Sequence, residues 1–236
     1  MEDYRKGNRS MLKKCLLLLM AAVLLLTAGC NYAFTTSGST GKPTTTVPNN
    51  TVPTTNNSGS NENVLDPSLK YYVDIEIQNY GKITILLEQD DAPITCANFV
   101  KLAQSGFYNG LTFHRIMEGF MMQGGDPEGT GFGGSKETII GEFAANGIAN
   151  MLSHTRGAIS MARSSAFNSA SSQFFIVHQD STFLDGGYAA FGYVTEGMDV
   201  VDAICAAAKP TDNNGKIPAD AQPVMTSVTI RTENGK

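Results

Sequence analysis

Two stretches of the chain combine apolar residues with a few polar ones at strand spacing, and they restrict the fold more than any other feature. They are FHRIMEGFMMQGGD at residues 113–126 and SSQFFIVHQDSTFLDG at residues 171–186. In a β-strand, side chains at positions i and i+2 share a face. Met121 and Gln123 are therefore expected to point the same way, and Arg115 adds a guanidinium to the same stretch.

The second stretch contributes a similar pair, because Gln173 and Phe175 are also two residues apart. Together the stretches predict an apolar patch edged by one guanidinium and two amides, with no nucleophile, metal cluster or carboxylate pair. Such a site can hold an apolar residue beside a peptide bond and act on it without covalent chemistry. Four further residues are expected to point away from the patch and into the core: Phe113, Phe174, Ile176 and Phe191.

Residues 1–29 are expected to be a signal peptide. The run CLLLLMAAVLLLTAG, residues 15–29, follows two lysines, and its length suits a signal core better than a membrane span. It leads into Cys30 in a TAGC sequence that resembles a bacterial lipobox, although Thr27 stands where leucine is usual. We therefore expect cleavage before Cys30 and lipidation of that cysteine, which would place an exported protein on the extracytoplasmic face of a membrane. An ordinary secretory signal is the alternative.

Residues 30–66 are rich in Thr, Ser, Asn, Pro and Gly. A segment with so little apolar surface is expected to be a disordered tether, with a root-mean-square span of roughly 30 to 36 Å. Residues 67–236 are expected to form one globular domain.

The net charge indicates which classes of partner the chain can bind, and the cysteine count leaves two thiols to explain. Removal of residues 1–29 takes away five of 17 basic and two of 22 acidic residues, which leaves 12 and 20 and a net charge of −8. An acidic chain without a basic cluster argues against nucleic acid as a partner. Cys96 and Cys205 remain in the globular part, and their pairing cannot be read from the sequence.

The hydrophobic pattern predicts about eight strands and two helices, and hence an antiparallel barrel closed by helices. A β-hairpin is expected first, then a helix that begins near Pro93 and ends at Gly106. A second helix is expected to end before Pro210. The expected strands are 71–77, 82–88, 111–116, 120–123, 158–161, 173–178, 190–194 and 224–230, and the expected helices are 93–106 and 198–208.

The motifs of this domain resemble those of the cyclophilin family of peptidyl-prolyl cis-trans isomerases. FHRI, GFMMQGGD, GTGFGG, GAISMAR, SSQFFI and FLDGGYAAFG occur in family order between about Tyr72 and Arg231, followed by a helix. The resemblance implies a mainly β fold, a closed eight-stranded antiparallel barrel capped by two α-helices at opposite ends. It therefore also implies that Cys96 and Cys205 are buried thiols rather than a disulfide. It implies isomerisation of X-Pro bonds without a cofactor or metal.

The resemblance also assigns the site. Arg115 and Gln123 are the expected catalytic residues, with Gln123 orienting Arg115 or the substrate carbonyl. In the twisted transition state the prolyl nitrogen gains a lone pair, which a fixed cationic donor can stabilise. The other expected site residues bind the proline ring (Phe120, Met121, Phe175 and Leu184), form its rim (Phe183 and Tyr188) or bind the peptide main chain (Ala162, Arg163 and Gln173).

Three positions depart from common family patterns. Phe183 replaces a tryptophan, Arg163 replaces an asparagine, and Tyr188 stands where many members have histidine. The loss of the indole N–H predicts weak binding of cyclosporin. None of these changes removes the guanidinium or the proline pocket.

The expected function is that of an exported, lipid-anchored, monomeric isomerase acting on unfolded or partly folded proteins that contain X-Pro bonds. Taken singly, Arg115 could be a surface ion-pair partner, and the apolar site residues could be core. The main alternative is a noncatalytic proline-binding or chaperone module, and a structural surface domain is a third. Gly129, Gly131 and Gly134 match a nucleotide-binding pattern, but no helix is expected after them. No local pattern supports a thiol protease dyad.

Overall fold

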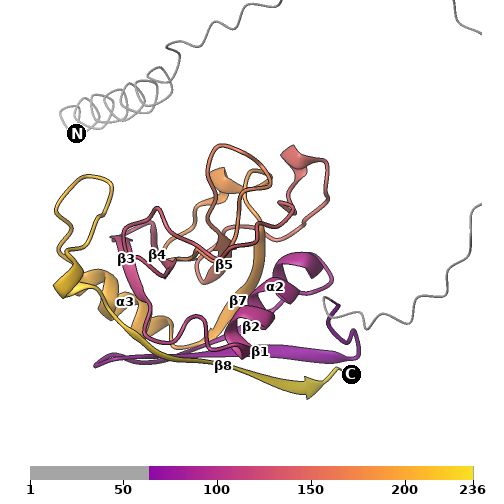
Figure 1. Ribbon diagram of the computed structural model, residues 1–236, viewed down its shortest axis with the longest axis horizontal. Helices are drawn as coiled ribbons and strands as arrows, with labels where there is room; N and C mark the ends of the chain where they lie inside the picture. The colour runs from indigo at the N-terminus through magenta and orange to yellow at the C-terminus, as the bar shows by residue number, and fades with distance from the viewer. Residues whose placement is uncertain (1–63, 236) are drawn as a thin grey trace, which may run out of the picture. The chain divides into compact units, whose positions relative to one another are not determined.

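The computed structural model describes residues 64–235, which belong to one compact unit of the chain (Figure 1). The predicted signal peptide, Cys30 and residues 30–63 of the predicted tether lie outside the described residues. Within residues 64–235, eight strands and two α-helices confirm the expected mainly β class. Their bounds are β1 Leu69–Ile77, β2 Gly81–Leu87, α2 Pro93–Gln104, β3 Thr112–Met117, β4 Met121–Asp126, β5 Ala158–Met161, β6 Phe174–Val177, β7 Ala190–Glu196, α3 Met198–Ala207 and β8 Met225–Asn234.

All neighbouring strands pair antiparallel in one curled sheet, in the order β3-β4-β6-β5-β7-β2-β1-β8. The two end strands meet where Thr112 of β3 bridges Val224, just before β8. A backbone bond from Phe113 N–H to the Pro223 carbonyl, 3.0 Å, supports this bridge. The sheet therefore curls until its ends touch at one short seam.

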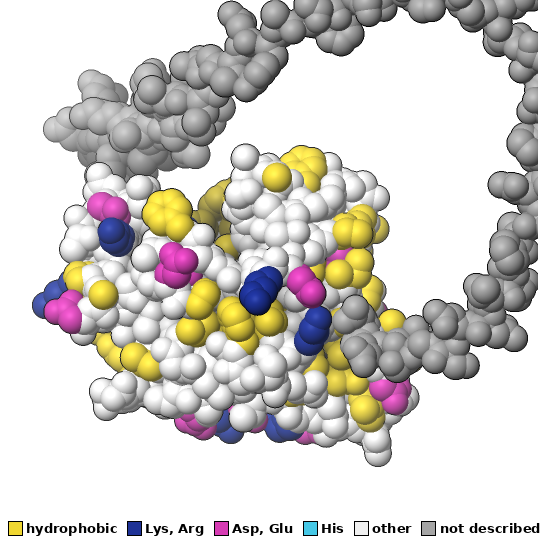
Figure 2. Space-filling view, in the orientation of Figure 1, with side chains coloured by type: hydrophobic (Ala, Val, Ile, Leu, Met, Phe, Trp, Pro, Cys, Tyr) yellow, Lys and Arg dark blue, Asp and Glu magenta, His cyan; other side chains and the backbone are white. Residues whose placement is uncertain are grey.

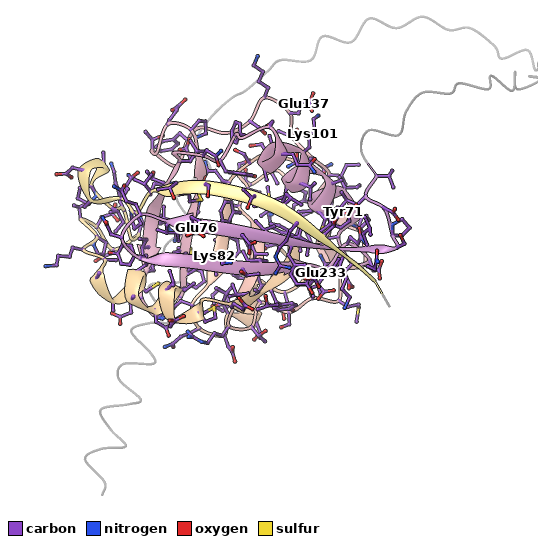
Figure 3. All side chains as sticks on the ribbon, turned by 90° about the horizontal axis from the view of Figure 1, so that it is seen from below. Tyr71, Glu76, Lys82, Lys101, Glu137 and Glu233 are labelled. Atoms are coloured by element: carbon purple, nitrogen blue, oxygen red, sulfur yellow. The ribbon has the colours of Figure 1, made fainter. Side chains whose placement is uncertain are left out.

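Apolar and polar side chains alternate along β1, which explains why this segment is a strand with one buried face. Val73, Ile75 and Ile77 are buried, whereas Glu76 is exposed and lies opposite Lys82 of β2. Opposite charges facing each other across two strands favour this register over a one-residue slip. Figure 3 shows Glu76 and Lys82 on these neighbouring strands, with β8 beside β1.

The helices bury one face each on different strands. α2 packs against β8 and α3 against β2, so the two helices cover different parts of the sheet. Cys96 of α2 and Cys205 of α3 are both buried and free, as expected. None of the helices among residues 64–235 is both long enough and apolar enough to cross a bilayer.

Strand and helix ends differ from the expected ones by a few residues. β4 continues through Gly124 and Gly125 to Asp126 rather than ending at Gln123. A Cβ at Gly124 would lie 2.7 Å from the carbonyl oxygen of Thr112, so only glycine lets β3 and β4 approach this closely. β8 extends to Asn234 because β1 pairs with it over its full length. Three unpredicted 3-10 turns are Ala144–Asn146, Thr182–Leu184 and Ala219–Ala221.

The hydrophobic residues separate into two clusters on opposite sides of the central strands. Phe113, Phe174, Ile176 and Phe191 belong to the main core, as expected from their alternation. Phe175, between two of them, belongs to a smaller cluster with Met121, Ala158 and Val177. The sheet thus has a second apolar face, which is where the site lies.

Candidate active site

A cavity of about 210 Å³ opens above the smaller hydrophobic cluster. Nine of the eleven residues predicted for the site in the globular domain line it: Arg115, Phe120, Met121, Gln123, Ala162, Arg163, Phe175, Leu184 and Tyr188. The two others, Gln173 and Phe183, lie beside it. Residues from β3, β4, β6 and three connecting segments are thus brought together from positions up to 73 apart in the chain.

The apolar floor of the cavity is supported from below. Met121 is 1% exposed and Phe175 is 5% exposed, and both pack with Ala158 and Val177. Phe175 and Tyr188 meet edge to face, with ring centroids 6.0 Å apart. A buried cluster of this kind limits side-chain movement, so the cavity has a firm apolar base suited to a small ring.

Arg115 stands at the edge of this cavity, opposite Gln123 in the β3–β4 register. Its Nη1 donates to Gln123 Oε1 at 3.1 Å, and its Nε donates to the Asn214 carbonyl at 2.6 Å. Its other near neighbours are the sulfur atoms of Met117, 3.2 Å from Nη2, and Met121, 3.8 Å from Nη1. Burial lowers the pKa of Arg115, yet arginine remains protonated in proteins at neutral pH.

The two predicted amides form a chain of hydrogen bonds. Gln123 Nε2 donates to Gln173 Oε1 at 2.9 Å. Gln173 Nε2 in turn donates to the carbonyls of Gly131 and Gly133, at 3.1 and 2.7 Å. In this conformation the Gln173 amide connects the glycine-rich loop to Gln123, and through it to Arg115.

Phe183 lies on the rim rather than in the cavity wall. It is 75% exposed and stacks on Phe120, with ring centroids 5.7 Å apart. It belongs to the 3-10 turn Thr182–Leu184, whose last residue lines the cavity. An exposed aromatic ring on a short turn can contact a bound peptide without filling the ring pocket.

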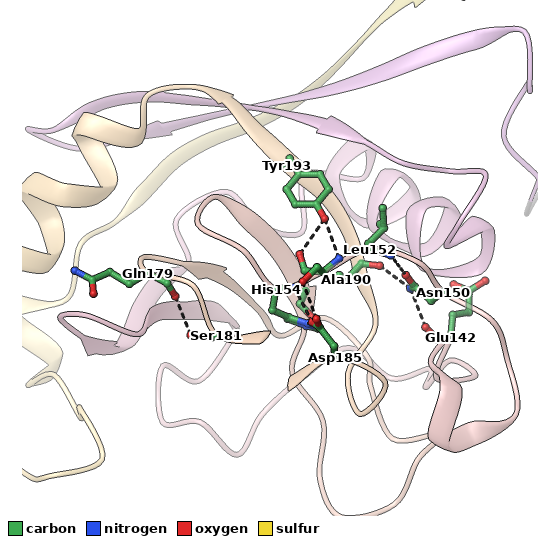
Figure 4. A network of polar contacts seen from close by, with 11 residues as sticks. Glu142, Asn150, Leu152, His154, Gln179, Ser181, Asp185, Ala190 and Tyr193 are labelled. Atoms are coloured by element: carbon green, nitrogen blue, oxygen red, sulfur yellow. Dashed lines mark hydrogen bonds and ion pairs between the residues drawn. The ribbon is translucent and has the colours of Figure 1, made fainter. Parts of the chain in front are cut away.

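A polar network behind the cavity holds that turn (Figure 4). Asp185 accepts hydrogen bonds from the backbone N–H of His154 at 2.7 Å and from Ser153 Oγ at 2.6 Å. His154 Nδ1 also lies 2.7 Å from Asp185, and Nε2 lies 2.9 Å from Ser160 Oγ. Burial lowers the pKa of His154, and the opposing effect of Asp185 does not overcome it. The neutral ring, fully buried, stacks against Phe175 and so supports the cavity floor.

Sequence reasoning missed several residues that position the site. Asn214 lies 99 residues from Arg115, and no local pattern indicates that its carbonyl accepts from the guanidinium. The Asp185 and His154 pair was missed too. A buried histidine beside an acidic residue gives no period in sequence, so only the folded chain shows it. Among residues 64–235, no three His, Cys, Asp or Glu side chains gather as metal ligands would.

Comparison with known proteins identifies this arrangement. Residues 72–232 match the family model for cyclophilin-type peptidyl-prolyl cis-trans isomerases. The chain is 46% identical over 123 residues to peptidyl-prolyl cis-trans isomerase B of Bacillus subtilis, covering 52% of this chain and 82% of that protein. It is 44% identical over 165 residues to a peptidyl-prolyl cis-trans isomerase of Acinetobacter baylyi, covering 66% of this chain and 84% of the relative.

Comparison with solved structures supports the same family. A cyclophilin-type isomerase of Cryptosporidium parvum, crystallised in the presence of the dipeptide Ala-Pro, has a TM-score of 0.60 and 30% sequence identity, covering 69% of this chain and 99% of that one. The chain therefore belongs to the cyclophilin-type peptidyl-prolyl cis-trans isomerases. It is an enzyme of the isomerase class, as predicted.

Proposed function

We propose that the chain accelerates rotation about X-Pro bonds without covalent chemistry, by stabilising the twisted amide through Arg115. Proteins folding outside the cytoplasm are the proposed substrates. The proline ring occupies the cavity above Met121 and Phe175. The observation that carries the proposal is the guanidinium of Arg115 at the edge of that cavity, in contact with Gln123.

The hydrogen bonds of Arg115 suit this role. Its two oxygen acceptors, Asn214 and Gln123, fix the plane of the guanidinium. The remaining near neighbours are thioether sulfurs, which are weak acceptors. N–H groups that face sulfur have no strong acceptor to give up, so they remain available to a better one, and the lone pair of a pyramidal prolyl nitrogen is such an acceptor. This acceptor exists only while the amide is twisted, so the bond favours the transition state over both planar isomers.

The size of the effect is consistent with a noncovalent mechanism. Uncatalysed exchange takes about 100 s, and shortening it to about 1 ms requires roughly 7 kcal/mol of transition-state stabilisation. One well-placed donor in a water-poor site supplies roughly 3 to 4 kcal/mol of this. Binding of the twisted ring and of the peptide main chain supplies the rest.

The proposal also includes the location of the protein, outside the cytoplasm and attached to a membrane. The apolar run at residues 15–29 and the lipobox-like sequence ending at Cys30 support export and attachment to a membrane by lipid. The polar composition of residues 30–66 supports a tether that holds a monomeric catalytic domain away from the surface. Mass spectrometry of the mature N-terminus tests this: an unmodified N-terminus other than Cys30 would contradict lipid attachment.

The mechanism is tested with Arg115→Ala in exchange measurements on a short X-Pro peptide and in proline-limited refolding. We expect kcat/KM to fall by about 10²- to 10³-fold, while the affinity for the peptide changes little. Arg115→Lys keeps the charge but loses the planar donors, so we expect an intermediate loss. Arg231→Ala, on the outer part of β8, is the matched control and should keep full activity.

Equal rates for the wild type and Arg115→Ala, with peptide binding intact, would reject the role of Arg115. If the wild type itself bound X-Pro peptides without accelerating exchange, the noncatalytic proline-binding or chaperone module would be favoured. Circular dichroism of each variant shows whether a lost rate reflects a lost fold.

A further inference from the structure

A second cavity, of about 490 Å³, adjoins the proposed proline pocket. The two cavities share Gln123, Ala162 and Arg163 in their walls. A peptide with proline in the first cavity would therefore place a residue close to the proline in or beside the second. The chemistry of the second cavity then bears on which X-Pro segments are accepted.

The walls of the second cavity mix polar groups with the apolar side chains of Phe132 and Ala162, and none of the described residues that line it is acidic. Four serines line it, Ser135, Ser164, Ser169 and Ser171, together with the glycine-rich segment 131–134 and the Gln173 side chain. Asp126 lies beneath this loop, but it is 1% exposed, and the backbone N–H groups of Glu128, Thr130 and Gly131 donate to it. Arg163 is the only charged side chain among the described residues that form the cavity wall.

The guanidinium of Arg163 is fixed where the two cavities meet. Nε and Nη2 donate to the Gly187 carbonyl at 3.0 and 2.7 Å, and Nη1 donates to the Ser164 carbonyl at 2.9 Å. Its Cζ lies 4.7 Å from the ring centre of Tyr188, with two further rings at 5.0 and 5.3 Å, those of Phe143 and Phe167. Three of its five N–H groups are used in this way, which leaves two for a ligand.

No carboxylate of the described residues lies within ion-pair distance of Arg163, in contrast to Arg156 and Arg231. Arg156 pairs with Asp202 at 2.8 Å, and Arg231 pairs with Asp74 and Glu233 at 3.2 and 2.6 Å. Arg163 is thus held by neutral carbonyls and aromatic faces, which orient a cation without neutralising it. Held this way, it is available to an anionic group on a bound peptide.

We propose that Arg163 makes the groove select X-Pro segments that carry an aspartate or glutamate near the proline, with the acidic side chain in the second cavity. The carboxylate accepts from the two remaining N–H groups of Arg163, and serine hydroxyls supply further donors. This inference rests on the proposed function, because it requires proline to bind in the first cavity. It goes beyond the X-Pro bond itself by naming the chemistry of a neighbouring substrate residue.

The test is an exchange measurement on matched X-Pro peptides that carry Glu, Gln or Lys at each of the three positions before and after the proline. For wild type, we expect a Glu peptide at one position to have a kcat/KM about fivefold above that of its Gln counterpart, with Lys lowest. The ratio between Glu and Gln should fall to near one in Arg163→Gln. It should also fall in high salt for the wild type, because salt screens the charge pair.

Arg231→Gln is the matched control, since Arg231 also lies over an aromatic ring, Tyr72 at 4.2 Å, but is paired with acidic residues. It should retain the wild-type ratio. Equal rates for Glu and Gln peptides at every position, or a ratio that Arg163→Gln leaves unchanged, would overturn the inference. If Arg163→Gln does not fold, the salt dependence of the wild-type ratio decides, and a salt-independent ratio rejects the charge pair. Absence of acceleration for all peptides would instead reject the proposed function.

Discussion

At the scale of single residues, the site depends on side chains whose partners come from distant parts of the chain. Arg115 is oriented by Gln123 on the neighbouring strand and by the Asn214 carbonyl in a loop after α3. Gln173 joins Gln123 to the glycine-rich loop. A chain of polar contacts of this kind fixes the guanidinium before a substrate arrives, which is what the role proposed for Arg115 in transition-state stabilisation requires.

Phe183 allows a prediction about cyclosporin. Phe183→Trp restores an indole N–H on the exposed rim, beside Phe120. One neutral hydrogen bond is worth roughly 1 kcal/mol, so we expect about three- to tenfold tighter binding of the drug. Isothermal titration calorimetry on the parent and the variant measures this.

Tyr72→Trp serves as the control, because Tyr72 lies on β1 beneath Arg231 and lines neither of the two cavities. It adds an indole at a different place and should leave the affinity unchanged. A Phe183→Trp variant that binds the drug no better than its parent would contradict the explanation based on the missing indole N–H.

At the scale of elements, the helix α2 begins without a capping side chain of its own. Ala92 occupies the N-cap position and makes no side-chain hydrogen bond. Glu142, from the loop before the 3-10 turn Ala144–Asn146, replaces the cap. Its carboxylate accepts from the backbone N–H of Ile94 at 3.0 Å and of Thr95 at 2.7 Å. The loop and the helix therefore stabilise each other. Figure 4 shows Glu142 joined through its backbone to Asn150, which also bonds Ala190.

Glu142→Gln tests this cap. A neutral amide keeps one acceptor but loses the charge that suits a helix N-terminus, so we expect the free energy of unfolding to fall by about 1 to 2 kcal/mol. Urea unfolding measured by circular dichroism gives the value. Glu137→Gln is the control, because that exposed residue forms a surface ion pair with Lys101 at 3.2 Å. Figure 3 labels the two residues near each other. A loss no larger than that of the control would reject the capping role.

At the scale of the whole molecule, acidic and basic side chains are dispersed on the face seen in Figure 2. We therefore expect the pH dependence of stability to come mainly from buried titratable side chains. His114 is 4% exposed, and neither of its ring nitrogens has a hydrogen-bond partner among the described residues. Burial lowers the pKa of His114 and that of His154.

These shifts predict how stability depends on pH. A histidine with a lowered folded pKa binds protons more readily when unfolded, so its contribution is complete above the unfolded value of about 6.5 and is lost as pH falls. The pKa of Asp126 is also lowered: burial alone would raise it, but hydrogen bonds from backbone N–H groups outweigh burial. Its contribution is present above about 4 and is lost in stronger acid. We expect the free energy of unfolding to fall in two stages, first below pH 7 and again below pH 4.

Urea unfolding between pH 8 and pH 3 measures the two stages. His114→Leu removes one of the titrating groups, so its curve should be flatter between pH 7 and 5 than that of the wild type. Stability that rises on acidification from pH 7 to 5 would contradict the assignment of the buried histidines as neutral.

By the resemblance of its motifs to a known family, the sequence named nine residues that line the first cavity. By its hydrophobic pattern, the sequence by itself determined the mainly β class and the order of the strands and helices. These follow from local regularities: alternation with a period of two places Phe174 and Phe175 on opposite faces, and Pro93 marks where α2 begins. In a sequence pattern glycines indicate turns, so the pattern predicts too short a β4, although Gly124 in fact permits close strand approach. Pattern alone does not show how close two backbones come.

Only the tertiary structure decided which groups orient the site. The Asn214 carbonyl at Arg115, the Glu142 cap on α2 and the aromatic rings around Arg163 all join residues far apart in sequence. Such contacts have no period and no fixed spacing, because they depend on how loops of different lengths return to one place. Periodicity reports which face of an element is buried, whereas the partners of a charged side chain are set by the packing of the whole domain.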